Sequence, residues 1–312
     1  MRILVSGGAG FIGSHIVDSA LAEGHEVAVL DNLSSGKREN LPPSVRLFEL
    51  DLRDRQGVLA LLTEFKPDTV SHQAAQASVA VSVRDPHLDV EINQLGGINL
   101  LDGCVAAKVR HVVFASTGGA LYGEVPDGQF ASEATPAAPI SPYAISKLAF
   151  EQLLAVYRTH HGLDSTVLRY ANVYGPRQDP HGEAGVVAIF FASVLAERTL
   201  KINARSAVGD AGCVRDYVYV SDVARANVSA LNGRLPERVM NVGTGKPIST
   251  LELATEIARV AGRDLRHEFT PPRAGDIERS VLDFGRFQAF FGQPVALADG
   301  LRQTFEWYRS QH

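Results

Sequence analysis

The stretch ILVSGGAGFIG, residues 3–13, decides the fold. A strand-like apolar run leads directly into Gly7, Gly10 and Gly13, and a helical pattern of apolar residues follows. Glycines at this spacing permit a tight turn, a close approach of the backbone to a pyrophosphate, and close packing of the helix on the strand. The free N–H groups at the start of the helix would then face the phosphates. The stretch predicts a dinucleotide-binding turn; a tight turn without a ligand is the alternative.

The next strand-like run, Val27–Leu30, is followed by Asp31. A carboxylate at this position accepts hydrogen bonds from the ribose hydroxyls of adenosine and repels the additional phosphate of NADP. We therefore expect NAD as the cofactor. Asp51 follows the third run and could accept a hydrogen bond from the adenine amino group, although capping of the next helix is an equally common role for such a residue.

Short β-branched runs alternate with longer amphipathic stretches as far as residue 170. Several runs are apolar throughout, which is typical of parallel strands covered on both faces. The expected strands are residues 3–6, 27–30, 45–50, 69–71, 112–115 and 166–170. This alternation predicts an α/β fold with a doubly wound parallel sheet of the Rossmann type.

The pattern changes after about residue 172, where Gly-Pro and Asp-Pro pairs predict loops and an apolar helix is expected at 186–196. Val218–Val220 and the residues 222–225 that follow predict another strand that feeds another helix, by which the chain would return to the sheet. We expect an NAD-binding domain at residues 1–171, rejoined by about 215–243. Residues 172–214 and 244–312 would form a smaller α/β lobe that binds substrate.

The composition narrows the class of protein. The 312 residues are 45% hydrophobic and 21% charged, with a net charge of −5, which is typical of a globular protein and unlike a nucleic-acid-binding one. The longest apolar stretch is shorter than the roughly 20 residues that cross a bilayer, and no signal peptide is evident. Cys104 and Cys213 form neither a disulfide framework nor a metal-ligand spacing. We expect a cytoplasmic protein without a metal site, and neither nucleic acid nor membrane as a partner.

Tyr143 and Lys147 are four residues apart in a segment with helical spacing of apolar residues. On one helix face, an ammonium roughly 5 Å from the phenol favours phenolate by about 3 kcal/mol at an effective dielectric constant near 20, before desolvation opposes it. Tyr143 could then accept a proton near neutral pH. Ser116 and Thr117 end the preceding strand at the edge where α/β sheets bind ligands. The alternatives are a solvated helix and a capped strand end.

The glycine motif and residues 31–36, DNLSSG, resemble the extended short-chain dehydrogenases, especially the UDP-glucose 4-epimerases. The resemblance covers almost the whole chain. It implies interconversion of UDP-glucose and UDP-galactose by reversible oxidation at carbon 4, with tightly bound NAD, by a homodimer. Gly118 and Gly119 stand where related 4,6-dehydratases carry an Asp-Glu pair, which disfavours elimination.

The resemblance also implies which residues contact the cofactor; for Asn93, a capping role is the alternative. The implied contacts are Gly7, Gly10, Phe11, Ile12, Gly13, Asp31, Asn32, Ser35, Gly36, Asp51, Leu52, Gln73, Ala74, Ala75, Asn93, Tyr143 and Lys147.

In the resembling enzymes a hydroxyl after this strand bonds the carbon 4 hydroxyl and passes its proton to the tyrosine. Counting from Phe114 assigns this role to Thr117, whereas counting back from Tyr122 reaches Gly118. The choice between Thr117 and Ser116 therefore stays open. Lys147 would hold the nicotinamide ribose.

Three later segments, residues 169–177, 209–218 and 271–276, resemble the substrate-binding segments of these enzymes. The resemblance implies that Asn172, Arg215 and Arg273 contact a nucleotide diphosphate and that Asp276 contacts the uridine ribose. Ser280 stands where some enzymes restricted to glucose and galactose carry Tyr. We expect this small residue to leave room for N-acetylated sugars.

Two other functions remain open. One is a related nucleotide-sugar epimerase or reductase, such as a UDP-N-acetylglucosamine or UDP-glucuronate 4-epimerase. The other is a non-catalytic sensor of NAD, which would not need Tyr143 or Lys147.

Overall fold

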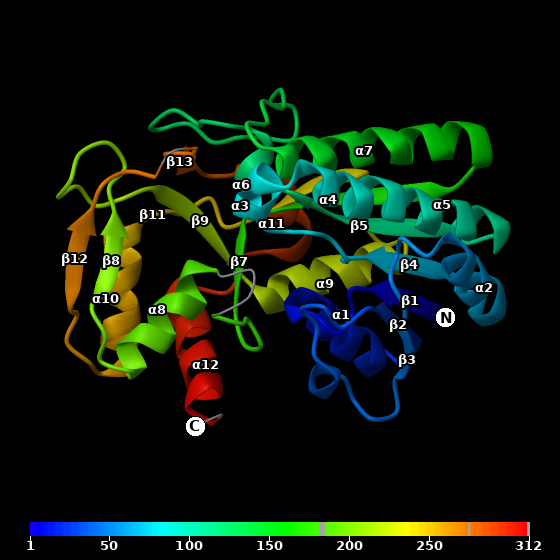
Figure 1. Ribbon diagram of the computed structural model, residues 1–312, viewed down its shortest axis with the longest axis horizontal. Coiled ribbons are helices and arrows are strands. Elements are labelled where there is room, and N and C mark those ends of the chain that lie inside the picture. Colours follow the sequence, from blue (N-terminus) through cyan, green and yellow to red (C-terminus); the bar gives the residue numbers. More distant parts are fainter. Residues whose placement is uncertain (181–184, 274, 311–312) are drawn as a thin grey trace. The chain divides into compact units, whose positions relative to one another are not determined.

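The computed structural model describes residues 1–180, 185–273 and 275–310 (Figure 1). Its central feature is a seven-stranded sheet in the order β10-β6-β5-β4-β1-β2-β3. The strands are β1 (Arg2–Ser6), β2 (Glu26–Asp31), β3 (Arg46–Glu49), β4 (Thr69–His72), β5 (His111–Thr117), β6 (Asp164–Tyr170) and β10 (Val239–Val242). The pairs that join β3, β2, β1, β4 and β5 are parallel. The predicted doubly wound sheet is confirmed, and its strand order reverses between β1 and β4, the position where such sheets bind nucleotides.

Helices cover this sheet, with α1 and α9 on one side and α5 and α7 on the other (Figure 1). Apolar side chains of α2, α5 and α7 form one core with the strands, which includes Leu62, Leu100 and Phe150. The elements are α1 (Phe11–Ala22), η1 (Arg38–Asn40), α2 (Arg55–Phe65), α3 (Val79–Arg84), α4 (Pro86–Val90), the π-helical turn η2 (Glu91–Gly96), α5 (Gly97–Ala106), α7 (Pro142–His161) and α9 (Val220–Leu231).

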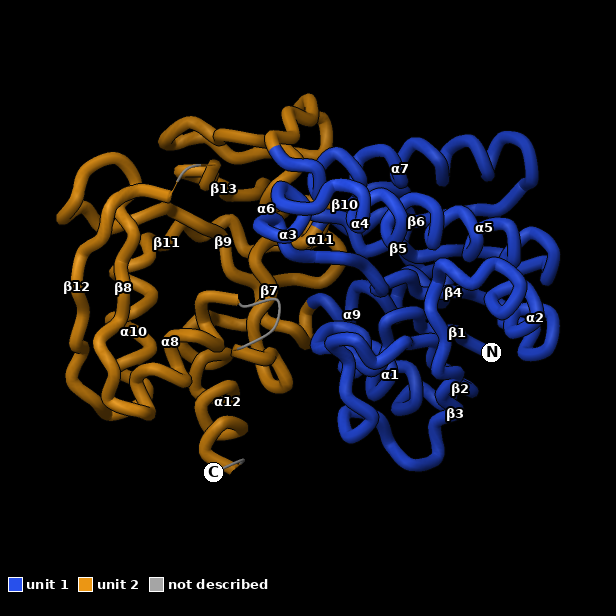
Figure 2. The backbone as a smooth tube through the Cα atoms, in the orientation of Figure 1, with its two compact units in different colours: residues 1–117, 141–169, 223–240 blue, residues 118–140, 170–222, 241–312 orange. Residues whose placement is uncertain are grey.

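The chain divides into two compact units (Figure 2). Unit 1 comprises residues 1–117, 141–169 and 223–240, and unit 2 comprises residues 118–140, 170–222 and 241–312. The division by contacts assigns residues 118–140 to unit 2, whereas the bounds predicted from the sequence assign them to the first domain.

Unit 2 contains a four-stranded sheet and a parallel pair of strands. The sheet consists of β7 (Asn172–Tyr174), β9 (Val214–Tyr219), β11 (Pro247–Ser249) and β13 (Arg279–Ser280), and the pair consists of β8 (Leu200–Asn203) and β12 (His267–Thr270). The helices are α6 (Gly118–Leu121), α8 (Val186–Leu195), α10 (Thr250–Ala261), α11 (Gly285–Phe291) and α12 (Leu297–Ser310).

The strand expected at Val218–Val220 lies in the smaller sheet, and the helix expected after it is present. Val218 belongs to β9, which pairs with β7, β11 and β13, and Val220 already begins α9. The chain returns to the large sheet through α9 and β10.

His72 ends β4 in the interior of unit 1. Its ring lies 5.6 Å from that of Phe114 and 5.2 Å from that of Phe150, and its Nδ1 is 2.7 Å from Ser6 Oγ. Burial, followed by the charge of Lys147, lowers the pKa of His72 to about 3. The imidazole therefore stays neutral in the folded protein at neutral pH.

We predict that His72 makes the protein less stable in mild acid. The unfolded chain binds a proton at this residue near pH 6.5, whereas the folded protein does so only near pH 3. Stability from this residue is therefore lost as the pH falls from 6.5 towards 3, by up to about 1.4 kcal/mol per pH unit. Urea unfolding between pH 7 and 4 should show a flatter pH dependence for His72→Gln. An equally steep dependence in both proteins would contradict this assignment.

Candidate active site

In the glycine turn after β1, neighbouring backbone atoms leave no room for a side chain at Gly7 and Gly13, but they leave room beside Gly10. Gly7 has a φ of +69°, and a Cβ there would lie 2.6 Å from Ala74 N. A Cβ at Gly13 would lie 2.1 Å from Gly7 O. At Gly10, however, a Cβ would approach only Gly7 O, at 3.2 Å. Gly7 and Gly13 are thus required by the protein's own backbone, while Gly10 leaves space for a ligand.

The start of α1 has the properties of an anion site. Gly10 is the N-cap and has no side chain to bond the free N–H groups, and the first turn carries no acidic residue. Phe11 and Ile12 therefore present backbone donors at the positive end of the helix dipole. This donor set fits the pyrophosphate of a dinucleotide.

Asp31 lies beside this turn at the end of β2. Its carboxylate accepts hydrogen bonds of 2.9 Å from Ala9 N and from Leu33 N. Burial raises the pKa of Asp31, against the lowering effect of these two bonds. A Cβ at Gly36 would come within 2.9 Å of both carboxylate oxygens, so glycine lets the following loop approach Asp31.

A second cluster of polar side chains consists of Asp51, Arg53 and Asn32, the last from the exposed loop after Asp31. The Asp51 carboxylate accepts from Arg53 Nη2 at 2.8 Å, from Arg53 Nε at 3.0 Å, and from Asn32 Nδ2 at 2.9 Å. Hydrogen bonding to Arg53 holds the pKa of Asp51 well below its usual range. Ser35 is exposed, whereas Leu52 is buried. Sequence reasoning missed the Asp51–Arg53 pair, because two residues of opposite charge at this spacing in a loop have no fixed geometry.

The segment after β4 runs along the glycine turn. Gln73 N and Ala74 N both donate to Ser6 O at 3.0 Å, and Ala75 is half-buried. The predicted Asn93 lies in η2 and is buried. Its amide bonds the backbone of Gln76.

Tyr143 and Lys147 lie in the first turns of α7, as their spacing predicts. The helix begins with Pro142 at its first position and with Ser141, whose Oγ accepts from Ala144 N at 3.2 Å. Lys147 is only 4% exposed, and its Nζ donates to Ala115 O at 3.0 Å. The Nζ lies 5.8 Å from the centroid of the Tyr143 ring. A buried ammonium beside the phenol favours the phenolate form of Tyr143.

Ser116 and Thr117 differ in their surroundings. Ser116 Oγ donates to Glu151 Oε1 at 2.5 Å in the interior. Glu151 is itself paired with Arg169, at 2.6 Å from Nη2 and 3.0 Å from Nε. Because neighbouring residues of a strand point to opposite faces, Thr117 is directed away from this ion pair. The ion pair of Glu151 and Arg169 was not predicted from the sequence, although Glu151 stands one helical turn after Lys147.

In unit 2, three of the predicted substrate residues gather around β9. Ser280 pairs with Arg215 in the parallel β13–β9 ladder. Asn172 Nδ2 donates to Asp216 O at 3.1 Å. Arg215 Nη1 donates to Val214 O at 3.0 Å.

Arg273 and Asp276 are exposed in the loop between β12 and β13, and Asp276 N donates to Arg273 O at 3.3 Å; Ala274 lies outside the described residues. Burial raises the pKa of the Cys213 thiol. The charge of Arg215 lowers this pKa and the charge of Asp276 raises it, so both charges act on the surroundings of Cys213.

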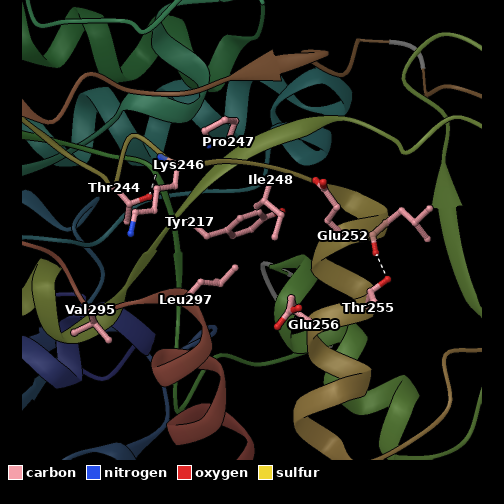
Figure 3. Close-up of a pocket in the computed structure, with 11 residues that line it drawn as sticks. Tyr217, Thr244, Lys246, Pro247, Ile248, Glu252, Thr255, Glu256, Val295 and Leu297 are labelled. Carbon is pink, nitrogen blue, oxygen red and sulfur yellow. Dashed lines mark hydrogen bonds between the residues drawn. The ribbon is translucent and has the colours of Figure 1, made fainter. Parts of the chain in front are cut away.

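A cavity of about 540 Å³ also lies within unit 2, and Figure 3 shows Tyr217 and Ile248 pointing from the strands towards α10. None of the described residues that we predicted to bind substrate lines it. The lining residues are Tyr217, Thr244, Lys246, Pro247, Ile248, Leu251, Glu252, Thr255, Glu256, Val295 and Leu297.

Among the described residues, no helix has both the length and the apolar character needed to cross a membrane.

Comparisons with known proteins agree with this geometry. Residues 3–243 match the model of the NAD dependent epimerase/dehydratase family. A UDP-glucose 4-epimerase of Mycolicibacterium smegmatis is 47% identical, over 100% of this chain and 99% of that protein. The structure of Thermus thermophilus UDP-glucose 4-epimerase in complex with NAD has a TM-score of 0.96 and 55% identity, covering 100% of both chains.

A second structure, Thermotoga maritima UDP-glucose 4-epimerase with UDP-glucose, has a TM-score of 0.93 and 43% identity, covering 100% of this chain and 99% of that one. With its glycine turn, its Asp31 and its Tyr143–Lys147 pair, the chain belongs to the NAD-dependent epimerase/dehydratase family.

Proposed function

We propose that the protein interconverts UDP-glucose and UDP-galactose by reversible oxidation at carbon 4, with tightly bound NAD. The observation that carries this proposal is the buried Lys147 ammonium beside the Tyr143 ring, in the same unit as the glycine turn. The full-length identity to UDP-glucose 4-epimerases supports the choice of substrate.

The residues of unit 1 fit NAD. The open side of Gly10 and the N–H groups of Phe11 and Ile12 would hold the pyrophosphate, and Asp31 would accept from the adenosine ribose. When bound, NAD supplies reversible acceptance of a hydride at its nicotinamide.

The protein's own residues would move the proton. Tyr143 takes the proton of the carbon 4 hydroxyl as phenolate and returns it after the ketosugar has turned over. Lys147 favours that phenolate by its charge and holds the nicotinamide ribose. Thr117 bonds the carbon 4 hydroxyl, because Ser116 is committed to Glu151. No net oxidation results.

Unit 2 supplies the groups for the nucleotide. Asn172, Arg215 and Arg273 would bind the diphosphate, since a planar guanidinium suits phosphate oxygens. Asp276 would bind the uridine ribose. Ser280, a small residue beside Arg215, would lie near carbon 2 of the sugar, which favours tolerance of N-acetylated sugars.

Incubation of the purified protein with UDP-galactose, without added cofactor, tests this function. We expect UDP-glucose to form and Tyr143→Phe to lower kcat by about 100-fold or more, because the proton acceptor is lost. Tyr157→Phe is a matched control, since it removes another phenol from α7 that bonds Asp102 instead. Product formation only with stoichiometric cofactor would identify a reductase. Binding of NAD without any conversion would identify a sensor.

The two hydroxyls after Phe114 can be separated by substitution. Thr117→Val should lower kcat by about 10- to 100-fold, because it removes a hydrogen bond to the reacting hydroxyl. Ser116→Ala should lower stability and leave kcat close to that of the wild type, because Ser116 bonds Glu151. Steady-state kinetics and thermal unfolding of both variants check this, and the opposite ranking in kcat would assign the role to Ser116.

We further propose a homodimer formed by the outer faces of α7 and η2. Ile145, Val156 and Leu95 are 54%, 48% and 54% exposed. Ile145 and Val156 lie on the same face of α7, and η2 packs against this helix. Exposed apolar side chains gathered on adjacent helices are typical of a subunit interface. The cytoplasmic location and a role in galactose metabolism stay predictions.

Val156→Arg should convert this dimer into a monomer, because it places a charge in the apolar interface. Light scattering after size-exclusion chromatography measures the mass. Val208→Arg is the control, since Val208 is 60% exposed and lies in unit 2. A wild-type mass equal to that of one chain would contradict the dimer.

A further inference from the structure

Asp89 carries a buried carboxyl that takes no part in the proposed proton transfer. It lies in α4 and is 0% exposed. Its Oδ1 accepts hydrogen bonds of 3.0 Å from Gln76 Nε2 and from Asn93 Nδ2. Its Oδ2 has no hydrogen-bond partner among the described residues. Burial of a carboxyl with so few partners costs free energy, so a contribution to stability does not explain why Asp89 is buried here.

The contacts of Asn93 show what Asp89 does. Asn93 Oδ1 accepts from Gln76 N at 2.9 Å, and Nδ2 donates to Gln76 O at 3.0 Å. The amide thus binds both polar groups of one residue's backbone. If it rotated by half a turn, its oxygen would face the Asp89 carboxyl and Gln76 O, both of which are acceptors. Asp89 therefore reinforces the one orientation of the Asn93 amide that the backbone of Gln76 favours.

This orientation connects η2 to the helix that carries Tyr143 and Lys147. Ser146 Oγ lies 3.2 Å from Asn93 Nδ2, as a third and more distant acceptor that shares the two hydrogens of the amide nitrogen, and Ser146 Oγ donates to Tyr143 O at 2.9 Å. The next residue of η2, Gln94, donates to Ser146 O at 2.5 Å. Two consecutive side chains of the π-helical turn thus hold the residue that precedes Lys147.

The same cluster also holds the segment that follows β4. Gln76 ends this segment, and Ala74 within it bonds Ser6 O and packs against Gly7. The backbone of Gln76 is bound by Asn93, and its side chain is bound by Asp89. Displacement of the Asn93 amide would therefore disturb the glycine turn and α7 together.

We propose that Asp89 is a positioning residue that, through Asn93, keeps the Tyr143–Lys147 turn of α7 in register with the segment at residues 73–76. Its effect on catalysis rests on the proposed function. Asn93, which we expected to contact the cofactor, acts in this proposal through Gln76 and Ser146, because these groups and Asp89 already occupy its amide.

Three variants test the proposal. Asp89→Ala removes the acceptor, and kcat for UDP-galactose should fall by about 10- to 100-fold while KM for UDP-galactose stays near wild type. Asp89→Asn keeps a carbonyl oxygen towards Asn93 and should recover most of kcat. Asp102→Ala is the control, because Asp102 also bonds α7, but at Tyr157, far along the helix from Tyr143.

Hydrogen–deuterium exchange gives a readout that does not depend on activity. In Asp89→Ala, the amides of residues 73–78 and 143–147 should exchange faster, whereas in Asp102→Ala they should not. Unchanged exchange and kcat in Asp89→Ala, or an Asp89→Asn variant as impaired as Asp89→Ala, would overturn the proposal. If the wild-type protein does not convert UDP-galactose, the proposed function fails, and the exchange data still decide whether Asp89 holds the two segments.

Discussion

The hydrogen bond from Lys147 Nζ to Ala115 O is the interaction on which the site depends. It places an ammonium in the interior, where desolvation is costly, and ties α7 to the end of β5. The Phe114 ring, with its centroid 4.9 Å from Nζ, provides a second favourable contact with the cation. Because the ammonium is fixed to the sheet, the Tyr143 ring is held beside a charge at a defined distance. In the proposed mechanism, the reactivity of the phenol therefore depends on the register between α7 and β5.

Two further contacts secure that register from either side. Glu151, one turn after Lys147, binds both Ser116 and Arg169, which joins α7 to β5 and β6. Much of the attraction in such a buried ion pair offsets the cost of removing its charges from water, so the pair adds little net stability. Its main effect in this protein is to hold α7, β5 and β6 in one arrangement. At the start of α7, the Ser141 cap fixes where the helix begins. The functional turn thus lies between a capped end and an anchored middle.

Local patterns in the sequence predicted the sheet, the glycine turn and the spacing of Tyr143 and Lys147, because each depends on residues close together in the chain. The choice between Ser116 and Thr117 depends on which face of β5 each occupies, and our proposal of Thr117 rests on the bond of Ser116 to Glu151, a residue of another element. The membership of β9 in the smaller sheet depends on pairing with β7, β11 and β13, strands that are remote in sequence. The π-helical turn at 91–96, which packs against α7, had no sequence signal.

The position of β10 at the edge of the large sheet, beside β6, has a consequence for biosynthesis. Residues 171–238 separate these two strands, and many of them belong to unit 2. The ribosome must therefore translate residues 118–140 and 170–222 of unit 2 before β10 can pair with β6. Until then β6 exposes an unpaired edge, which is a template for association with other chains. During that interval the nascent chain carries an open strand edge that the folded protein does not have.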